Sequence, residues 1–68
     1  MRLRHTEAAP VKLLLTVDEA AQALCLGRSL IYELMARKEI FSVKIGRVRR
    51  IPLAALQAFI ERQMTEGE

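Results

Sequence analysis

The sequence predicts a mainly α-helical domain with a small β-hairpin, built from three helices and two paired strands. Apolar residues recur at intervals of three and four positions in residues 17–24, 30–35 and 53–64, which is typical of helices with one buried face. Between the second and third of these segments, apolar and polar residues alternate from Phe41 to Ile45. Such alternation indicates a half-buried strand.

The length and composition limit the possible functions. The chain has 68 residues, 51% of them apolar and 28% charged, which is a globular composition with room for one small core and no large catalytic cleft. A single cysteine excludes an internal disulfide. The sequence contains no apolar run long enough to indicate a secretory signal or a membrane span. We therefore expect a cytoplasmic protein with a flexible arm (residues 1–12), one folded domain (13–64) and a disordered tail (65–68).

The first two helices are predicted to cross at a steep angle. Thr16 and Glu19 have the spacing of a capping box, so the first helix should begin after Thr16 and end near Leu24. Residues 25–27 are then the whole connection to the second helix, and so short a connection favours a helix-turn-helix. Ala21 supplies the small side chain that such a crossing needs.

The remaining elements are a hairpin and a third helix. Gly46 and Arg47 fit a two-residue type II′ turn, after which residues 48–51 return as the second strand. Pro52 can open a helix over about 53–64. Residues 13–15 are expected to add a small strand to the hairpin. The apolar stripe of the third helix is predicted to comprise Leu53, Leu56, Ile60 and Met64, with Phe59 beside it.

Positive charge is concentrated in the middle of the chain. The net charge is +3 overall, but residues 28–50 hold seven Lys and Arg side chains against two Glu side chains, which gives +5. This pattern indicates a surface for a polyanion, although a solvated basic face is the alternative. A projecting helix fits the major groove of duplex DNA, and a cationic hairpin can follow the sugar-phosphate backbone or enter a minor groove. The side chains expected to contact DNA are Arg28, Ser29, Tyr32, Arg37, Lys44, Arg47, Arg49 and Arg50.

Individual roles on the second helix follow from side-chain chemistry. Arg28 can donate to guanine, and Ser29 can reach a base or a phosphate. Tyr32 can contact a phosphate or a thymine methyl group. Glu33 can accept from cytosine or orient Arg37 four residues later, and we favour the second role because phosphates repel a carboxylate.

Nothing in the sequence indicates catalysis. Asp18 and Glu19 are adjacent carboxylates, but their place in the first turn of a helix explains them better than acid–base chemistry does. Cys25 is interpreted as a small hydrophobic residue of the turn. The chain has no nucleophile–base pair, phosphate-binding glycine loop or ligand cluster. We therefore expect no enzymatic activity, no cofactor and no metal site.

Residues 13–63 resemble the excisionase-type, MerR-like winged helix-turn-helix DNA-binding domain family. The motifs that carry the resemblance are, in order, LLTVDEAAQAL, SLIYELM, VKIGR and RIP-x-x-x-L. The resemblance implies three helices plus a two-stranded wing, which is the hairpin predicted above. It also implies that the second helix enters the major groove and that the wing contacts the adjacent backbone. It places Arg28, Ser29, Tyr32 and Arg37 on the helix surface and Arg47 and Arg49 on the wing, with Arg50 at a commonly basic position.

The chain departs from the family pattern at four places. Cys25 and Lys38 stand where the family usually has Gly, and Gly27 stands where a Ser or Thr cap is usual. The family also usually has an aromatic residue near Arg49, which this chain lacks.

The function implied by the resemblance is that of an excisionase-like recombination directionality factor. Such a protein binds and bends duplex DNA next to an integrase and is encoded by a bacterium, a phage or a mobile element. The sequence offers no heptad pattern and no exposed apolar stripe for a strong dimer, so we expect weak or DNA-dependent self-association. A stand-alone MerR-like transcriptional regulator is the alternative of the same class. A protein-interaction module that uses its basic face on an acidic partner is the alternative of another class.

Overall fold

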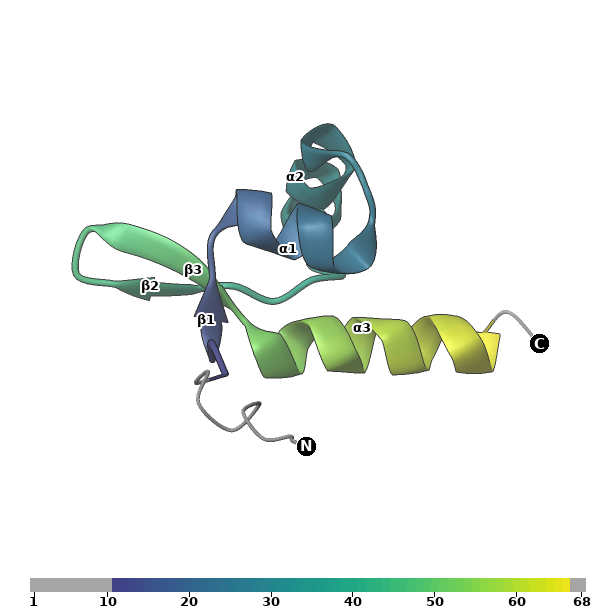
Figure 1. Ribbon diagram of the computed structural model, residues 1–68. Helices are drawn as coiled ribbons and strands as arrows, with labels where there is room; N and C mark the ends of the chain where they lie inside the picture. Colours follow the sequence, from purple (N-terminus) through teal and green to yellow (C-terminus); the bar gives the residue numbers. More distant parts are fainter. Residues whose placement is uncertain (1–10, 67–68) are drawn as a thin grey trace, which may run out of the picture.

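The computed structural model describes residues 11–66, and its elements follow one another as the sequence predicts. They are β1 (Leu14–Leu15), α1 (Val17–Leu24), α2 (Arg28–Ala36), β2 (Val43–Ile45), β3 (Val48–Pro52) and α3 (Leu53–Glu66) (Figure 1). Three helices and an antiparallel hairpin confirm the predicted winged helix-turn-helix. Residues 1–10 of the predicted arm and residues 67–68 of the predicted tail lie outside the described residues.

Helix α1 begins with the predicted capping box. The backbone N–H of Glu19 donates to Thr16 Oγ1 at 3.1 Å, and the backbone N–H of Thr16 donates to Glu19 Oε1 at 2.9 Å. Helix α1 ends at Leu24, and the C-cap residue Cys25, with a φ of 58°, turns the chain toward α2. Ala21, at 5% exposure, packs in the core with Ile31 of α2, so a small residue does lie at the crossing.

The three strands form one sheet in the order β1-β3-β2, which confirms the small strand predicted near Leu14. Pro52 is the last residue of the central strand β3 and lies opposite Leu14, so β3 ends one residue later than predicted, while α3 starts at Leu53 as predicted. A proline is tolerated at this strand end because the next residue supplies the hydrogen bond. The backbone N–H of Leu53 donates to the carbonyl of Leu13 at 2.8 Å.

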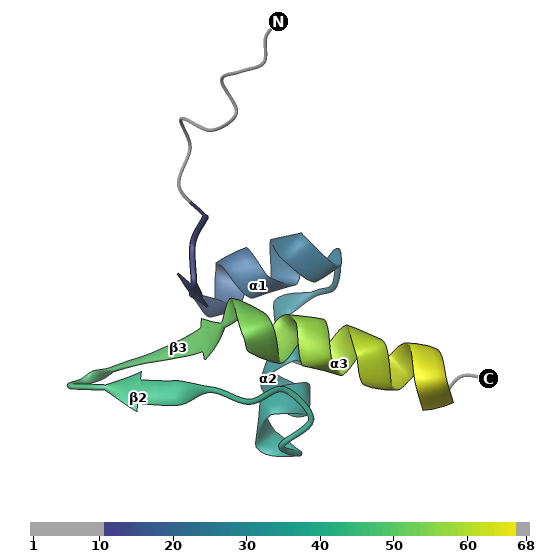
Figure 2. The same ribbon diagram turned by 90° about the horizontal axis from the view of Figure 1, so that it is seen from below.

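The core lies between the α1–α2 pair, the sheet and the first half of α3. Figures 1 and 2 both show the second half of α3 extending past α1 and α2. The core residues are Leu15, Ala20, Ala21, Ile31, Leu34, Ile40, Ile51, Leu56 and Phe59.

The predicted stripe on α3 is therefore wrong in its second half. Leu56 and Phe59 are buried, but Ile60 is 41% and Met64 67% exposed, because the second half of α3 extends past α1 and α2 (Figure 1). Helix α3 also continues to Glu66, so Thr65 and Glu66 are helical and do not belong to a disordered tail. No helix-breaking residue stands before Glu66 to end the helix earlier.

The strand predicted from Phe41 starts later, at Val43. Phe41 is 66% exposed, whereas its neighbour Ile40 is only 1% exposed. The reason is the chain reversal after α2, where Lys38 has a φ of 64° and the backbone N–H of Ile40 donates to the carbonyl of Leu34 at 3.2 Å. This reversal turns Ile40 inward and leaves Phe41 outside.

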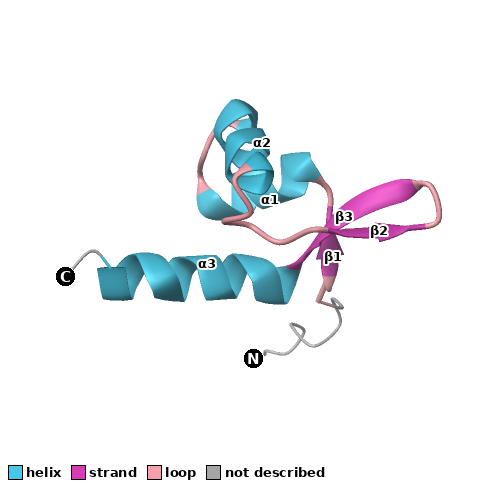
Figure 3. Cartoon of the chain, turned by 180° about the vertical axis from the view of Figure 1, so that it is seen from behind, coloured by secondary structure: helices cyan, strands magenta, loops and turns pink. Residues whose placement is uncertain are grey.

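The wing projects away from the helices, as Figure 3 shows. Ile45 pairs with Val48, so Gly46 and Arg47 form the predicted two-residue turn. Gly46 has a φ of 63°, the positive value that the first central position of a type II′ turn requires.

Candidate nucleic-acid interface

Helix α2 turns one face to the core and the other to solvent. Ile31 and Leu34 are buried, and Tyr32 is 58% exposed on the opposite face. Arg28 and Ser29, in the first turn of α2, are also exposed. The helix that the sequence assigns to DNA recognition is therefore free on the side that carries its polar residues.

Two hollows join the exposed face of α2 to the wing. One, of about 290 Å³, is lined by Thr16, Val17, Asp18, Arg28, Tyr32, Arg49 and Arg50, and we call it the arginine hollow. The other, of about 370 Å³, is lined by Tyr32, Met35, Ala36, Lys38, Ile40, Phe41, Ser42 and Arg49. Tyr32 and Arg49 line both hollows, so the helix and the wing form one continuous surface.

The strand register of the wing divides its cations between two faces. Lys44 lies opposite Arg49 on one face, while Arg50 lies opposite Val43 on the other. Arg49 Nη1 donates to Ser42 Oγ at 3.1 Å, which holds this side chain near the base of the wing. Arg50 Nη1 donates to the carbonyl of Arg49 at 3.0 Å. Arg47 is exposed in the turn.

The arginines of α2 have carboxylate partners at the surface. Arg28 Nη1 lies 3.2 Å from Asp18 Oδ1 at the start of α1. Arg37 Nη1 lies 3.6 Å from Glu33 Oε2, which agrees with the interpretation of Glu33 as the partner of Arg37, and Arg37 Nε lies 3.9 Å from Glu39 Oε2. Exposed pairs of this kind are weak, so both arginines can exchange a carboxylate for a phosphate.

Among the predicted contact residues, the structure brings four together in the arginine hollow: Arg28, Tyr32, Arg49 and Arg50. Ser29 is exposed on α2, and Arg37 is exposed directly after the end of α2. Lys44 and Arg47 are exposed on the wing. Sequence reasoning missed Lys38 and Phe41, which line the second hollow. The exposed phenyl ring could not be found from the sequence because the alternating pattern assigned it to the buried side of a strand.

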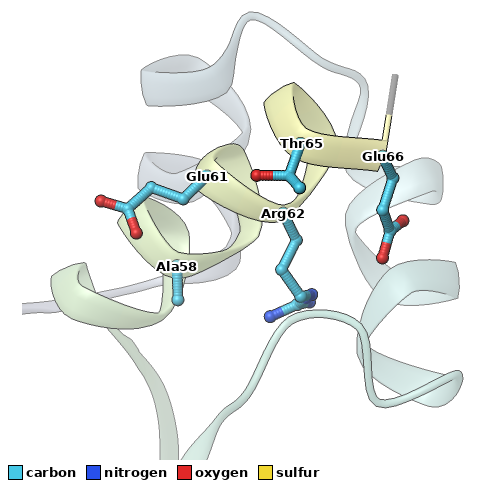
Figure 4. Close-up of a pocket in the computed structure, with 5 residues that line it drawn as sticks. All are labelled: Ala58, Glu61, Arg62, Thr65 and Glu66. Carbon is cyan, nitrogen blue, oxygen red and sulfur yellow. The ribbon is translucent and has the colours of Figure 1, made fainter. Parts of the chain in front are cut away.

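A third hollow, of about 340 Å³, lies on α3 and is lined by Ala58, Glu61, Arg62, Thr65 and Glu66 (Figure 4). In this view, Arg62 points toward the segment that follows α2, while Glu61 and Glu66 lie to either side. Arg62 Nη2 donates to the backbone carbonyl of Glu39. This arginine therefore ties α3 to the chain reversal after α2, and its carboxylate neighbours make the hollow a poor site for a polyanion.

The carboxylate of Glu19 belongs to the fold. The side chain of Lys12, and then the backbone N–H of Thr16, hold the pKa of Glu19 below its ordinary value. Within residues 11–66, no cluster of three or more His, Cys, Asp and Glu side chains is placed to hold a metal ion. No helix in that range has the length and apolar character needed to cross a lipid bilayer.

Comparison with known proteins places this geometry in a family. Residues 14–64 match the family model described as a helix-turn-helix domain. A protein of Saccharopolyspora erythraea named probable excisionase is 49% identical over 57 residues, which are 84% of this chain and 58% of that protein. An excisionase of Streptomyces ambofaciens is 42% identical over 54 residues, 79% of this chain and 87% of that protein. The chain belongs to the excisionase-type helix-turn-helix domain family.

The chain spans 58% of the length of the Saccharopolyspora relative and most of the Streptomyces one. No solved structure matches it. Helix-turn-helix domains bind duplex DNA through the exposed side of their second helix. In this chain that helix is α2, and its exposed side is the one that the two hollows join to the cationic wing.

Proposed function

We propose that this protein is a sequence-specific duplex DNA-binding protein without enzymatic activity, which acts as an excisionase-like recombination directionality factor. It docks α2 in the major groove and lays the wing along the adjacent backbone. The observation that carries the proposal is the junction at Tyr32 and Arg49, which makes the outer face of α2 and the cationic wing one surface. The names of the two relatives support the role in excision.

Contacts divide between the two elements. On and after α2, Arg28, Ser29, Tyr32 and Arg37 face the groove and its edges. On the wing, the phosphate contacts come from Lys44, Arg47, Arg49 and Arg50, which the strand register and the turn distribute over both faces of the hairpin. A single module of this size covers about 600–1,000 Å² of surface, so useful specificity needs several copies on repeated sites. Copies bound side by side bend the DNA and present it to an integrase.

The site of action follows from this role. Both relatives come from bacteria, so we place the protein in the bacterial cytoplasm, on DNA of the chromosome or of a mobile element. A stand-alone transcriptional regulator uses the same interface, but no observation favours it. The acidic-partner alternative is not favoured either, because the cations gather on the two elements that meet DNA in this fold.

The decisive experiment is footprinting on the DNA that flanks the gene, with and without a recombinase encoded beside it. We expect protection of repeated sites and a change in the recombinase footprint. If the protein protects its sites but changes transcription and not recombination, the result supports a stand-alone transcriptional regulator instead.

Salt dependence tests the DNA interface separately. About four to six phosphate contacts give a log–log slope of binding against salt near −4 to −5. Arg47→Ala should weaken binding to all duplexes alike, because a residue in the wing turn contacts backbone and reads no base. A flat salt response would point to the acidic protein partner.

A further inference from the structure

The arginine hollow concentrates positive charge at the meeting point of three elements. Arg28 comes from the first turn of α2, Arg49 and Arg50 come from β3, and the start of α1 closes the remaining side. Among the described residues that line it, Asp18 is the one carboxylate. The three arginine side chains that line this hollow carry like charges, which repel each other, and an anion seated in the hollow reduces that repulsion.

Asp18 satisfies Arg28 only in part. A single contact of 3.2 Å joins Arg28 Nη1 to Asp18 Oδ1, and the two side chains remain 67% and 69% exposed. A guanidinium group has five N–H donors, so most of the donors of Arg28 stay available. Two oxygens of a phosphate can accept two parallel hydrogen bonds from the guanidinium group. Such a bidentate pair is stronger than the single exposed contact that Arg28 makes with Asp18.

The position of Asp18 decides what it can do when DNA arrives. It stands in the first turn of α1, close to the hollow that the phosphate would enter. Its carboxylate competes for Arg28 and also repels a phosphate in the hollow. Both effects lower affinity for any duplex, because phosphates are the same at every base sequence.

On the basis of the proposed function, we propose that the arginine hollow seats one phosphate of the DNA backbone and that Asp18 competes with it for Arg28. Arg28 is then a phosphate ligand, and not the reader of guanine that the sequence indicated. Asp18 sets the overall affinity of the protein without setting its base preference. Weak binding to unrelated DNA leaves the protein free to find its repeated sites.

The test compares the wild type with Asp18→Asn by fluorescence anisotropy, on a footprinted duplex and on an unrelated one. At about 50 mM salt, Asp18→Asn should bind both duplexes about three- to tenfold more tightly, and the gain should shrink at about 200 mM salt. Glu61→Gln removes the same charge on α3, outside the hollow, and should change affinity less than about twofold. Asp18→Ser repeats the result if the first variant folds poorly.

A double-mutant cycle shows whether Asp18 acts through Arg28. In an Arg28→Ala background, Asp18→Asn should change affinity less than about twofold, because the competition no longer exists. Weaker binding by Asp18→Asn, an equal gain from Glu61→Gln, or an undiminished gain without Arg28 would each overturn the inference. A change of base preference at one position in Arg28→Ala would overturn it as well. If the wild type binds neither duplex, the proposed function itself fails.

Discussion

Lys44 and Arg49 stand directly opposite each other across the β2–β3 hairpin, so two cations share one face of the wing. Like charges at directly opposed strand positions destabilise a hairpin. Arg49 also lines both hollows beside Tyr32, which places this cationic pair next to the exposed face of α2. An arrangement that costs stability in the free protein is explained if the pair meets a polyanion.

Lys44→Thr should therefore have opposite effects on stability and on binding. Without the repulsion, and with a residue that favours strands, the free energy of unfolding should rise by up to about 0.5 kcal/mol. Affinity for every duplex should fall about three- to tenfold, with the salt slope reduced by about 1. Urea denaturation and anisotropy measure the two effects, and Lys44→Arg should leave both near wild type. A less stable variant with unchanged binding would show that this face of the wing does not meet DNA.

The sequence was sufficient for the elements that local patterns determine. The capping box at Thr16, the turn at Gly46 and the short connection at residues 25–27 depend on neighbours in the chain, and all three are present. The exposed face of α2 follows from helical spacing alone, so the positions of Ile31 and Leu34 are enough to predict that Ser29 and Tyr32 point to solvent.

Contacts between residues that are distant in the sequence could not be predicted from local patterns. Phe41 lies outside the core, against expectation, and Ile40 is buried beside it, because the chain reverses at Lys38 before the strand begins. The contact of Arg62 with the carbonyl of Glu39 joins residues 23 apart in the chain, and no spacing rule connects them. The junction of α2 with the wing at Tyr32 and Arg49 is likewise a product of packing.

The capping box of α1 makes the fold sensitive to acid. The pKa of Glu19 is lowered from its ordinary value of 4.5, mainly by the hydrogen bond from Lys12 and then by the backbone N–H of Thr16. A carboxyl group whose pKa is lower in the folded state stabilises the fold above its unfolded pKa, and that contribution is lost as the pH falls through the folded pKa. The melting temperature should therefore drop as the pH falls below about 4.5.

Glu19→Gln isolates this contribution, because glutamine can keep the cap hydrogen bond but does not titrate. At neutral pH, the variant should melt at a lower temperature than the wild type. Its melting temperature should fall less on acidification, so the melting temperatures of the two proteins converge at low pH. Glu61→Gln, outside the capping box, should keep the wild-type dependence. Parallel curves for Glu19→Gln and the wild type would contradict the assignment.

The N-terminus of α2 lacks a side-chain cap, and Gly27→Ser should supply one. Gly27 has φ −74° and ψ 156°, which serine adopts without strain, and no side-chain hydrogen bond caps the helix there. A Cβ at this position would meet no heavy atom within 4 Å. We expect urea denaturation to show a gain of about 0.3–1 kcal/mol from the hydroxyl cap and the stiffer unfolded chain. Gly27→Ala lacks the hydroxyl and should gain less; an equal gain would exclude capping as the cause.

The turn between α1 and α2 stores strain at Cys25, which Cys25→Gly should release. Its φ of 58° and ψ of 40° are left-handed, a conformation that costs an L-residue about 1–2 kcal/mol. Because glycine also makes the unfolded chain more flexible, the expected net gain in the free energy of unfolding is about 0.5–1 kcal/mol. Cys25→Ala keeps the Cβ and should show no gain. Lys38, at φ 64°, is a less suitable test because its side chain also lines the second hollow. If Cys25→Gly is no more stable than Cys25→Ala, the left-handed conformation at this position does not destabilise the fold.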